Sequence, residues 1–371
     1  MAVKTYKLGD LIEPSEERNV TEKLKVEDVR GISTGKEFIE TKANMDGVSL
    51  SSYKIVKQYE FAYVSDTSRR GDKISLAYNK ENVEYLVSSI STVFYVKQPK
   101  ILLSDYLFIY FNRPEFDRFS RFNSWGSARE TFSWDDLCDI DIVLPDLPTQ
   151  QKYVQIYQSL VANQKSYERG LEDLKLVCDG FLDELKKKCK KQEVGTIFTE
   201  IDRRNTDGKI SSVKGINIEK KFIDSVADIN GIDLKKYKVV QKNELAYSGM
   251  QTGRDECVRI ALQNSDEPIL ISPAYSVFKV DESKALPEYV MIWFSRTEID
   301  RLGWFYSDAS IRANLDNDRL FEMLIPIPDI NVQKSIANIY KVYNERKRIN
   351  EQLKQQIKDI CPILIKGSLE E

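Results

Sequence analysis

The sequence predicts an α+β protein with two similar, mainly β domains separated by two long antiparallel coiled-coil helices, arranged with pseudo-two-fold symmetry. Three observations lead to this prediction. The 371-residue chain repeats itself, each copy begins with short strand-like runs, and each copy ends with an apolar heptad pattern. A change from strand-like to heptad periodicity indicates separate β and helical parts within each copy.

The internal repeat divides the chain into two copies of one unit. Val-Arg-Gly-Ile at 29–32 returns as Val-Lys-Gly-Ile at 213–216, and Tyr-Lys-Ile-Val at 53–56 returns as Tyr-Lys-Val-Val at 237–240. Both pairs are separated by 184 residues, so two copies account for nearly all of the 371 residues. Two similar but non-identical halves suit a ligand that is itself nearly two-fold, and duplex DNA is the commonest such ligand.

The composition is typical of a folded protein that lacks the commonest catalytic groups. Hydrophobic residues make up 42% of the chain, which is ample for buried cores. Histidine is absent, which removes the commonest general base and zinc ligand and lowers the expectation of an enzyme. The five cysteines are scattered without metal-ligand spacing, so we expect free thiols and no metal site. Without a bilayer-length apolar run or a secretory segment, the chain is expected to be cytoplasmic and not membrane-bound.

The net charge of −3 argues only weakly against nucleic-acid binding, because binding needs a local basic surface rather than a basic chain. Arginines do gather in short stretches of the sequence. They are Arg69, Arg70, Arg113, Arg118, Arg121, Arg129, Arg203, Arg204, Arg296, Arg301 and Arg312.

The first part of each copy has the residue pattern of a mainly β region. Short runs rich in Val, Ile, Tyr and Phe at 60–64, 73–78 and 91–96 predict strands, and a helix is expected at 104–112. The second copy repeats this pattern of short apolar runs, with Asp207-Gly208 and Asn230-Gly231 as hairpin-type turns.

The second part of the first copy carries a heptad seam, which predicts a long coiled-coil helix. Its positions alternate four and three residues apart, and only Gln164 among them is polar. They are Tyr153, Tyr157, Leu160, Gln164, Tyr167, Leu171, Leu174, Cys178, Phe181 and Leu185.

The second copy carries a matching seam that Arg346 and Asn350 interrupt, and Pro362 is expected to kink or end its helix. The seam positions are Val332, Ile336, Ile339, Tyr343, Arg346, Asn350, Leu353, Ile357, Ile360 and Leu364. Each helix is the natural partner of the other, in which case buried Gln164, Arg346 and Asn350 fix the register. The alternative is that each helix packs only on its own β domain.

The junction between the two parts carries a family resemblance. In the first copy, Gly-Ser-Ala-Arg at 126–129 precedes Ser-Trp-Asp-Asp-Leu at 133–137, a strand ending in Leu-Pro at 144–145, and Thr-Gln-Gln-Lys at 149–152. The second copy has the same order at 309–312, 316–320, 324–328 and 332–334. This duplicated order resembles the specificity subunit of a type I restriction–modification system. Two residues separate the prolines in the first copy where one does in the second.

The resemblance implies a division into residues 1–148 and 191–330 as target-recognition domains, with 149–190 and 331–371 as spacer helices. Each domain is then expected to read one half of a bipartite, asymmetric site in double-stranded DNA. The helices would set the spacing and dock two modification subunits, with restriction subunits completing the complex. S-adenosylmethionine, ATP and Mg²⁺ are expected on those partners, with no cofactor and no catalytic residue in this chain.

Two polar loops in each copy are the expected DNA-reading segments, because Arg, Asn, Gln, Ser and Thr are the side chains that recognise bases and phosphates. The expected contacts are Arg18, Thr67, Ser68, Arg69, Arg70, Lys73, Ser124, Ser127 and Arg129 in the first copy, and Arg204, Gln251, Thr252, Arg254, Ser307, Ser310 and Arg312 in the second. The expected seam between the spacer helices comprises Tyr157, Leu160, Gln164, Tyr167, Leu171, Leu174, Ile339, Tyr343, Arg346, Asn350, Leu353 and Ile357. The structural alternatives are ordinary hairpin loops and a pairing of Arg129 with Glu130 or Asp135.

Other functions compete with this interpretation. The chain is alternatively a specificity subunit for a fused restriction–modification enzyme, or a coiled-coil scaffold that reads no DNA. Ser-Pro-Ala-Tyr at 272–275 only half matches a methyltransferase loop and has no counterpart in the first copy. Glu345 and Lys347 lie two apart on a predicted helix and face different ways, which excludes a shared nuclease metal site.

Overall fold

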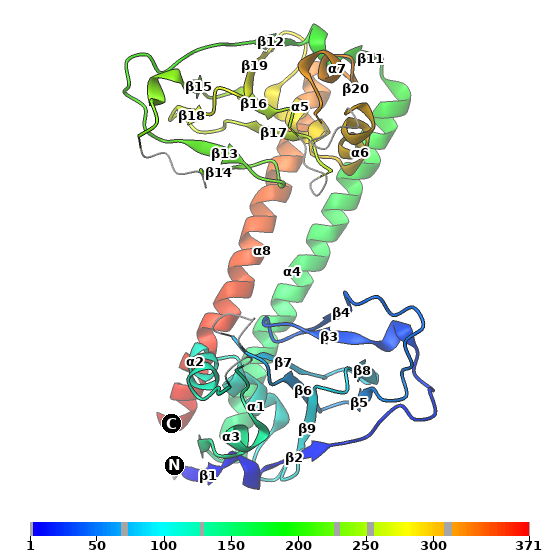
Figure 1. Cartoon of the computed structure of the whole chain (residues 1–371), viewed down its shortest axis with the longest axis vertical. Helices are drawn as coiled ribbons and strands as arrows, with labels where there is room; N and C mark the ends of the chain where they lie inside the picture. Colours follow the sequence, from blue (N-terminus) through cyan, green and yellow to red (C-terminus); the bar gives the residue numbers. More distant parts are fainter. Residues whose placement is uncertain are drawn as a thin grey trace. The chain divides into compact units, whose positions relative to one another are not determined.

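The computed structural model describes residues 3–67, 73–126, 130–225, 231–250, 256–307 and 314–370. The chain forms two compact units: unit 1 comprises Met1–Glu168 with Ile349–Glu371, and unit 2 comprises Arg169–Arg348. Both units contain the same kinds of element in the same order (Figure 1). The predicted fold class is confirmed, because two similar strand-rich domains are joined to two long helices.

Unit 1 is built around a four-stranded antiparallel sheet in the order β2-β9-β6-β7, with β1 paired to β10, β3 to β4 and β5 to β8. The strands are β1 (Lys4–Lys7), β2 (Ile12–Ser15), β3 (Arg30–Ile32), β4 (Phe38–Glu40), β5 (Lys54–Val56), β6 (Phe61–Val64), β7 (Ser75–Tyr78), β8 (Tyr85–Val87), β9 (Thr92–Val96) and β10 (Asp141–Leu144). The short helices are α1 (Ser104–Phe111), α2 (Pro114–Phe122) and α3 (Trp134–Cys138).

Unit 2 repeats this topology with the sheet order β12-β19-β16-β17, and with β11 paired to β20, β13 to β14 and β15 to β18. The strands are β11 (Lys191–Glu193), β12 (Phe198–Glu200), β13 (Lys214–Ile216), β14 (Phe222–Asp224), β15 (Lys238–Val240), β16 (Glu244–Ser248), β17 (Arg259–Leu262), β18 (Ile269–Ile271), β19 (Ser276–Val280) and β20 (Leu324–Pro326). The short helices are α5 (Pro287–Phe294), α6 (Thr297–Tyr306) and α7 (Asn317–Phe321).

The central strands β6 and β16 are buried on both faces, in keeping with the apolar residues at 61–64 and 245–247. Alternate side chains of a strand point to opposite faces of the sheet. Phe61 and Tyr63 therefore belong to the large core beneath α1, whereas Ala62 and Val64 belong to a second core with β5 and β8. Both faces of β6 are thus packed against a core, so the β6–β7 loop begins at a well-fixed position.

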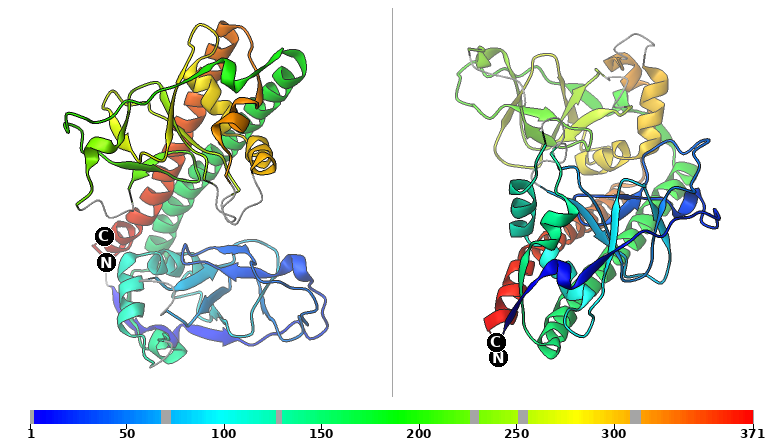
Figure 2. Two further views of the ribbon diagram at one scale, coloured as in Figure 1. Left: turned by 45° about the horizontal axis from the view of Figure 1, so that its top comes forward. Right: turned by 60° about the horizontal axis from the view of Figure 1, so that its bottom comes forward.

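The long helices are α4 (Leu147–Lys188) and α8 (Ile330–Glu370). In unit 1, the beginning of α4 and the end of α8 share one core, to which Val154 and Ile365 both contribute. In unit 2, the end of α4 and the beginning of α8 share the other core, through Leu182 and Ile336. The two helices therefore run antiparallel within each unit, where they lie side by side in every view (Figure 2).

Each long helix begins in the same way. Asp146 accepts a hydrogen bond from the backbone N–H of Thr149 over 2.9 Å, and Asp329 does so from Asn331 over 2.8 Å. An aspartate at this position satisfies N–H groups that the helix leaves unpaired. Neither Asp146 nor Asp329 belongs to the junction motifs described above, so the sequence patterns did not predict this capping role.

A buried glutamine then ties each helix start to its domain. The amide of Gln150 donates to the carbonyls of Ile101 and Pro145 and accepts from the N–H of Leu103. Gln333 makes the matching three bonds, to Lys284, Pro328 and Leu286. Both glutamines are fully buried.

Three expectations for the helices need correction. Helix α8 does not end at Pro362 but continues to Glu370. The burial of Cys361, Leu364 and Ile365 in the unit 1 core outweighs the hydrogen bond that the proline removes.

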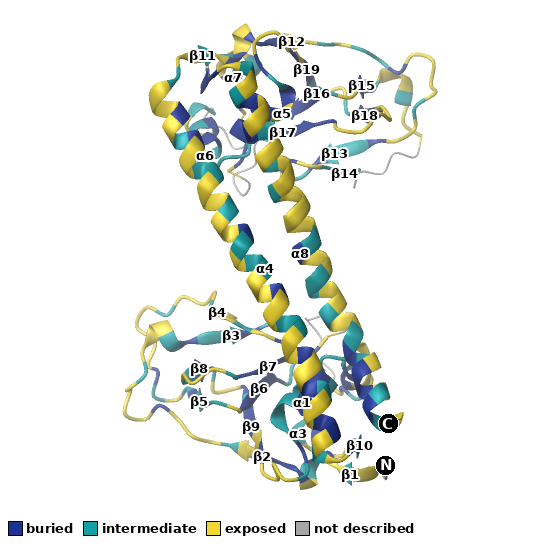
Figure 3. Cartoon of the chain, turned by 180° about the vertical axis from the view of Figure 1, so that it is seen from behind, coloured by how far each residue is buried: buried dark blue, intermediate teal, exposed yellow. Residues whose placement is uncertain are grey.

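The other two corrections concern the seam positions of the long helices. Phe181 was expected on the seam of α4 but is 41% exposed, whereas the adjacent Leu182 is buried. In α8, Ile339 and Arg346 are exposed although the strict heptad places them on the seam. Figure 3 shows that exposed, intermediate and buried residues alternate along α8. A straight helix has 3.6 residues per turn, so a 3.5-residue pattern drifts off the packed side.

In the part of the chain that the structure describes, none of the helices has both the length and the apolarity of a membrane span. Within the same residues, no cluster of His, Cys, Asp and Glu has the makings of a metal site.

Candidate nucleic-acid interface

Two loops of unit 1 that are far apart in sequence meet at the end of β6. The N–H of Thr67 donates to the carbonyl of Glu130 over 3.0 Å, and the N–H of Phe132 donates to the carbonyl of Ser65 over 2.8 Å. Asp66 and Thr131 form an antiparallel bridge between these bonds. The β6–β7 loop and the α2–α3 segment, both expected to read DNA, are therefore held together by backbone hydrogen bonds.

Unit 2 repeats this meeting. The N–H of Leu315 donates to the carbonyl of Gly249 over 2.8 Å, and the hydroxyl of Tyr247 donates to the carbonyl of Leu315 over 2.5 Å. A Cβ atom on Gly249 would lie 2.5 Å from the Leu315 oxygen, so the two segments of unit 2 lie closer than a side chain here would allow, although unit 1 has Ser65 at the equivalent position. Met250 and Asn314 form the bridge that corresponds to the one in unit 1.

The described candidates at these loops divide into buried and exposed side chains. Thr67 is buried and its hydroxyl donates to the Glu130 carbonyl over 3.2 Å, and buried Ser124 donates to the Ser120 carbonyl over 2.5 Å. These hydroxyls fix the loops and do not face solvent. Ser307, which is half-buried, donates to the Trp304 carbonyl, whereas Lys73 is exposed in the β6–β7 loop.

Ten of the expected DNA contacts lie outside the described residues. They are Ser68, Arg69, Arg70, Ser127 and Arg129 in the first copy, and Gln251, Thr252, Arg254, Ser310 and Arg312 in the second. The residues that flank these segments are the ones that the backbone bonds bring together in each unit.

Arg18 and Arg204 belong to another part of each unit. Arg18 donates to the carbonyl of Ser52 over 2.8 Å, and Arg204 donates to the carbonyl of Lys236 over the same distance. Each also pairs with a nearby carboxylate, Glu16 at 3.6 Å or Asp202 at 2.6 Å. These arginines tie the segment after β2 or β12 to the chain before β5 or β15, and among the described residues their hydrogen bonds and ion pairs do not reach the converging loops.

A buried ion pair that sequence reasoning missed anchors α2 and the converging loops. The ammonium of Lys36 pairs with Asp117 on α2 and donates to the carbonyl of Ile74 over 2.9 Å. Asp117 also accepts from the N–H of Ile74 over 3.3 Å. Burial lowers the pKa of Lys36, and the neighbouring Asp117 opposes that shift. The pair therefore joins the β3–β4 turn, α2 and the chain entering β7.

The same anchor recurs in unit 2. Lys220 pairs with Asp300 on α6 over 2.6 Å, and Asp300 accepts from the N–H of Val258 over 2.9 Å. Lys36 and Lys220 are 184 residues apart, so the repeat spacing was the sequence signal that would have identified the pair. Both lysines have positive φ angles, 66° and 60°, at equivalent turns.

The helix seam of unit 1 contains a polar pair in an otherwise apolar contact. Gln164 and Asn350 are 6% and 2% exposed, and the Gln164 amide donates to the Asn350 oxygen over 3.0 Å. Glu168 and Lys354 form an ion pair of 2.6 Å beside them. Of the other expected seam residues, Tyr157 and Leu171 are buried, and those half-buried are Leu160, Tyr167, Leu174, Tyr343, Leu353 and Ile357.

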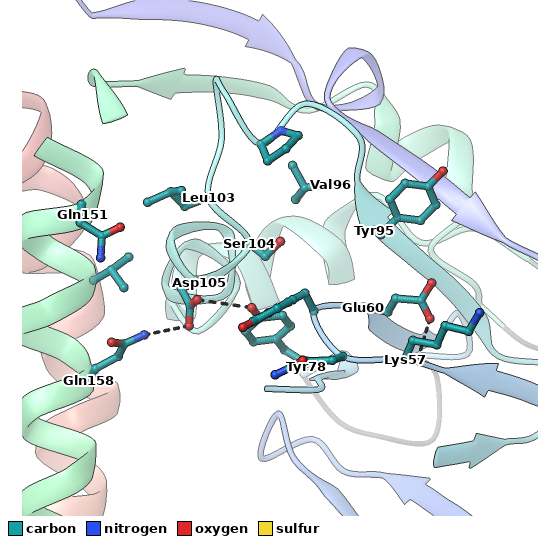
Figure 4. Close-up of a pocket in the computed structure, with 14 residues that line it drawn as sticks. Lys57, Glu60, Tyr78, Tyr95, Val96, Leu103, Ser104, Asp105, Gln151 and Gln158 are labelled. Atoms are coloured by element: carbon teal, nitrogen blue, oxygen red, sulfur yellow. Dashed lines mark hydrogen bonds between the residues drawn. The ribbon is translucent and has the colours of Figure 1, made fainter. Parts of the chain in front are cut away.

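A surface pocket of about 550 Å³ lies in unit 1 beside the start of α4 (Figure 4). Asp105 accepts hydrogen bonds from Gln158 over 3.2 Å and from the hydroxyl of Tyr78 over 3.4 Å. Glu60 accepts from the Lys57 N–H, and burial raises the pKa of that carboxyl. None of the expected DNA contacts that the structure describes lines this pocket.

Known structures with the same architecture define the class of fold. The chain aligns with the S subunit of a type I restriction–modification system from M. genitalium over 99% of this chain and 96% of that one, with a TM-score of 0.56 and 11% identity. A chain from a structure of complex assembly and conformational transition of the type I R–M system aligns over 99% and 97%, with a TM-score of 0.52 and 11% identity. The fold is therefore that of a type I specificity subunit.

Sequence comparison also finds a similar specificity subunit. The curated HindI type I restriction enzyme specificity subunit of Haemophilus influenzae is 21% identical over 187 residues, which is 48% of this chain and 40% of that relative. The match thus spans less than half of the relative's length. No family model matches the chain. The resemblance seen in the duplicated junction motifs is confirmed by these comparisons.

Proposed function

We propose that this chain is the sequence-specific DNA-recognition subunit of a type I restriction–modification complex, with each unit reading one half of a bipartite, asymmetric site. The observation that carries the proposal is the paired meeting of two loops in both units. The backbone bonds of Phe132 with Ser65 and of Leu315 with Gly249 are equivalent, whereas the adjoining loop sequences differ. A repeated frame with different polar side chains is the arrangement expected for two readers of different half-sites.

The long helices have the complementary role of setting the distance between half-sites and docking two modification subunits. Restriction subunits complete the proposed complex. The chain itself is proposed to be non-catalytic, so that methylation and cleavage, with S-adenosylmethionine, ATP and Mg²⁺, belong to its partners. The buried Gln164–Asn350 pair supports a fixed helix register, because a polar pair in an apolar seam penalises any other alignment.

The deciding experiment is purification of the tagged chain from its native host, followed by a methylation assay of the co-purified complex and sequencing of the methylated motif. We expect a split motif. Replacing Arg69 and Arg70 with Ala should relax or abolish recognition of one half, and replacing Arg254 with Ala should affect the other half.

The matched control is Lys57→Gln, since Lys57 is an exposed cation on unit 1 that pairs with Glu17. This variant should methylate the wild-type motif at the wild-type rate. Recovery of the chain without a methyltransferase, or a motif indifferent to the loop substitutions in both units, would overturn the proposal.

A further inference from the structure

The two most exposed large hydrophobic side chains among the described residues occupy equivalent positions in the two copies. Phe122 ends α2 and Phe305 lies near the end of α6, and each is 79% exposed. They are 183 residues apart, as are Asp117 and Asp300 of the buried anchors. Leaving a phenylalanine in water forgoes the stabilisation that burial would give, and here it happens twice at one place in the fold.

Each phenylalanine shares a helix face with an exposed arginine. Arg118 lies four residues before Phe122, and Arg301 lies four residues before Phe305. Residues four apart are neighbours on one face of a helix. Both arginines are exposed, and among the described residues Arg118 makes a surface ion pair with Glu115 at 3.4 Å. Each unit thus has one exposed arginine beside one exposed phenylalanine ring.

The buried anchors fix the direction of these side chains. Asp117 immediately precedes Arg118, and Asp300 immediately precedes Arg301; both aspartates face inward to pair with Lys36 or Lys220. Because adjacent residues on a helix point in different directions, the inward aspartate leaves the arginine and phenylalanine turned to solvent. The ends of α2 and α6 lead directly into the segments that meet the β6–β7 and β16–β17 loops.

We propose that Arg118 with Phe122, and Arg301 with Phe305, form a pair of equivalent duplex-DNA contacts, one in each unit. The arginine binds a backbone phosphate and the phenyl ring packs against the sugar or the exposed edge of a base. This inference rests on the proposed DNA-binding function and adds residues that lie outside the two polar loops. Duplex DNA is favoured over a protein partner because the cation recurs with the ring in both copies, at the border of both candidate interfaces.

The test uses the full chain in its purified complex and a fluorescently labelled duplex of mixed sequence, titrated at several salt concentrations. Phe122→Ala and Phe305→Ala should each weaken binding by roughly tenfold without changing the salt dependence, because the lost contact is apolar. Arg118→Gln and Arg301→Gln should weaken binding and reduce the slope of log K against log salt by about 0.9, the value for one lost phosphate contact.

Tyr59→Ala and Lys57→Gln are the matched controls, since Tyr59 is 53% exposed and Lys57 is an exposed cation elsewhere on unit 1. Both should bind as wild type. If the wild-type complex binds no duplex, the proposed function and this inference both fail. If the wild type binds and all four variants bind equally well, only this inference fails. Unchanged DNA affinity with loss of a co-purified subunit would also overturn it, and would assign the rings to a protein partner.

Discussion

Gln164 of α4 donates its side-chain amide to Asn350 of α8 across 3.0 Å, inside the helix seam of unit 1. Glu168 lies beside them and also accepts from the Gln164 amide, over 3.2 Å. The two helices meet here through side chains that can satisfy each other only in one axial alignment. Sliding either helix by a turn would leave buried amide groups without partners, which is costly.

Removing one member of this pair should therefore destabilise the protein. Gln164→Leu is expected to lower the free energy of unfolding by about 1–3 kcal/mol, because the Asn350 side-chain oxygen stays buried and loses its hydrogen-bond donor. Urea denaturation followed by circular dichroism measures the change. The double variant Gln164→Leu/Asn350→Leu should recover most of the loss, while Gln155→Leu on the exposed side of α4 should change little. A single variant as stable as wild type would contradict the assigned pairing.

The ion pair of Glu168 with Lys354 predicts a pH dependence in acid. The hydrogen bond from Lys354 holds the pKa of Glu168 below its usual value. A carboxyl with a depressed folded-state pKa contributes stability above its unfolded pKa, near 4.3, and loses it as the pH falls through the folded value. The stability difference between wild type and Glu168→Gln should thus be largest near neutrality and shrink below about pH 4.3. A difference that grows on acidification would refute this assignment.

The buried pair of Lys36 with Asp117 should be far more sensitive than a surface ion pair. Lys36→Met leaves the Asp117 carboxylate poorly compensated and is expected to cost about 3–5 kcal/mol of stability. The double variant Lys36→Met/Asp117→Leu should cost much less, because no buried charge remains. Lys220→Met should reproduce the loss in unit 2. Calorimetric melting of the four proteins checks the set, and equal stability of single and double variants would be inconsistent with it.

Gly249 should not tolerate a side chain. In Gly249→Ala the new Cβ would lie 2.5 Å from the Leu315 oxygen, so the two loops of unit 2 must separate. We expect a loss of about 1–3 kcal/mol, comparable to overpacking a core, and impaired reading of one half-site. Gly215→Ala is the control, since nothing lies within 4 Å of its added Cβ. Thermal melting and motif sequencing give the two readouts; a Gly249→Ala protein that matches Gly215→Ala in both would refute the close contact.

The sequence was most informative where structure follows a local period or the repeat. The heptad pattern identified α4 and α8 and marked Gln164 and Asn350 as polar seam positions, but it misplaced Ile339 and Arg346. A strict heptad suits a supercoiled pair, and short stretches of helix packed on a globular core instead follow the 3.6-residue period. The twofold occurrence of the motifs, more than any one of them, predicted the fold.

Side-chain partners that are distant in sequence could not be predicted in this way. The motif at the start of α4 included Gln150, yet nothing local shows that its amide bonds to Ile101 and Leu103. Lys36 was unremarkable in the sequence because its partner Asp117 is on another element. The buried roles of Thr67 and Ser124 have the same origin, since a polar residue in a loop has no sequence signal that separates a base contact from a hydrogen bond to backbone.

The core of unit 1 contains residues from both ends of the chain, since Leu8 and Leu11 share it with Cys361, Leu364 and Ile365. Unit 2, by contrast, is one continuous segment. On the ribosome, the segment for unit 2 is therefore fully made while unit 1 still lacks its last helical turns. We expect unit 2 to fold first during translation and the early part of unit 1 to wait with exposed apolar surface. Translation halted before Cys361 would then release a nascent chain with one finished unit and one that needs chaperone protection.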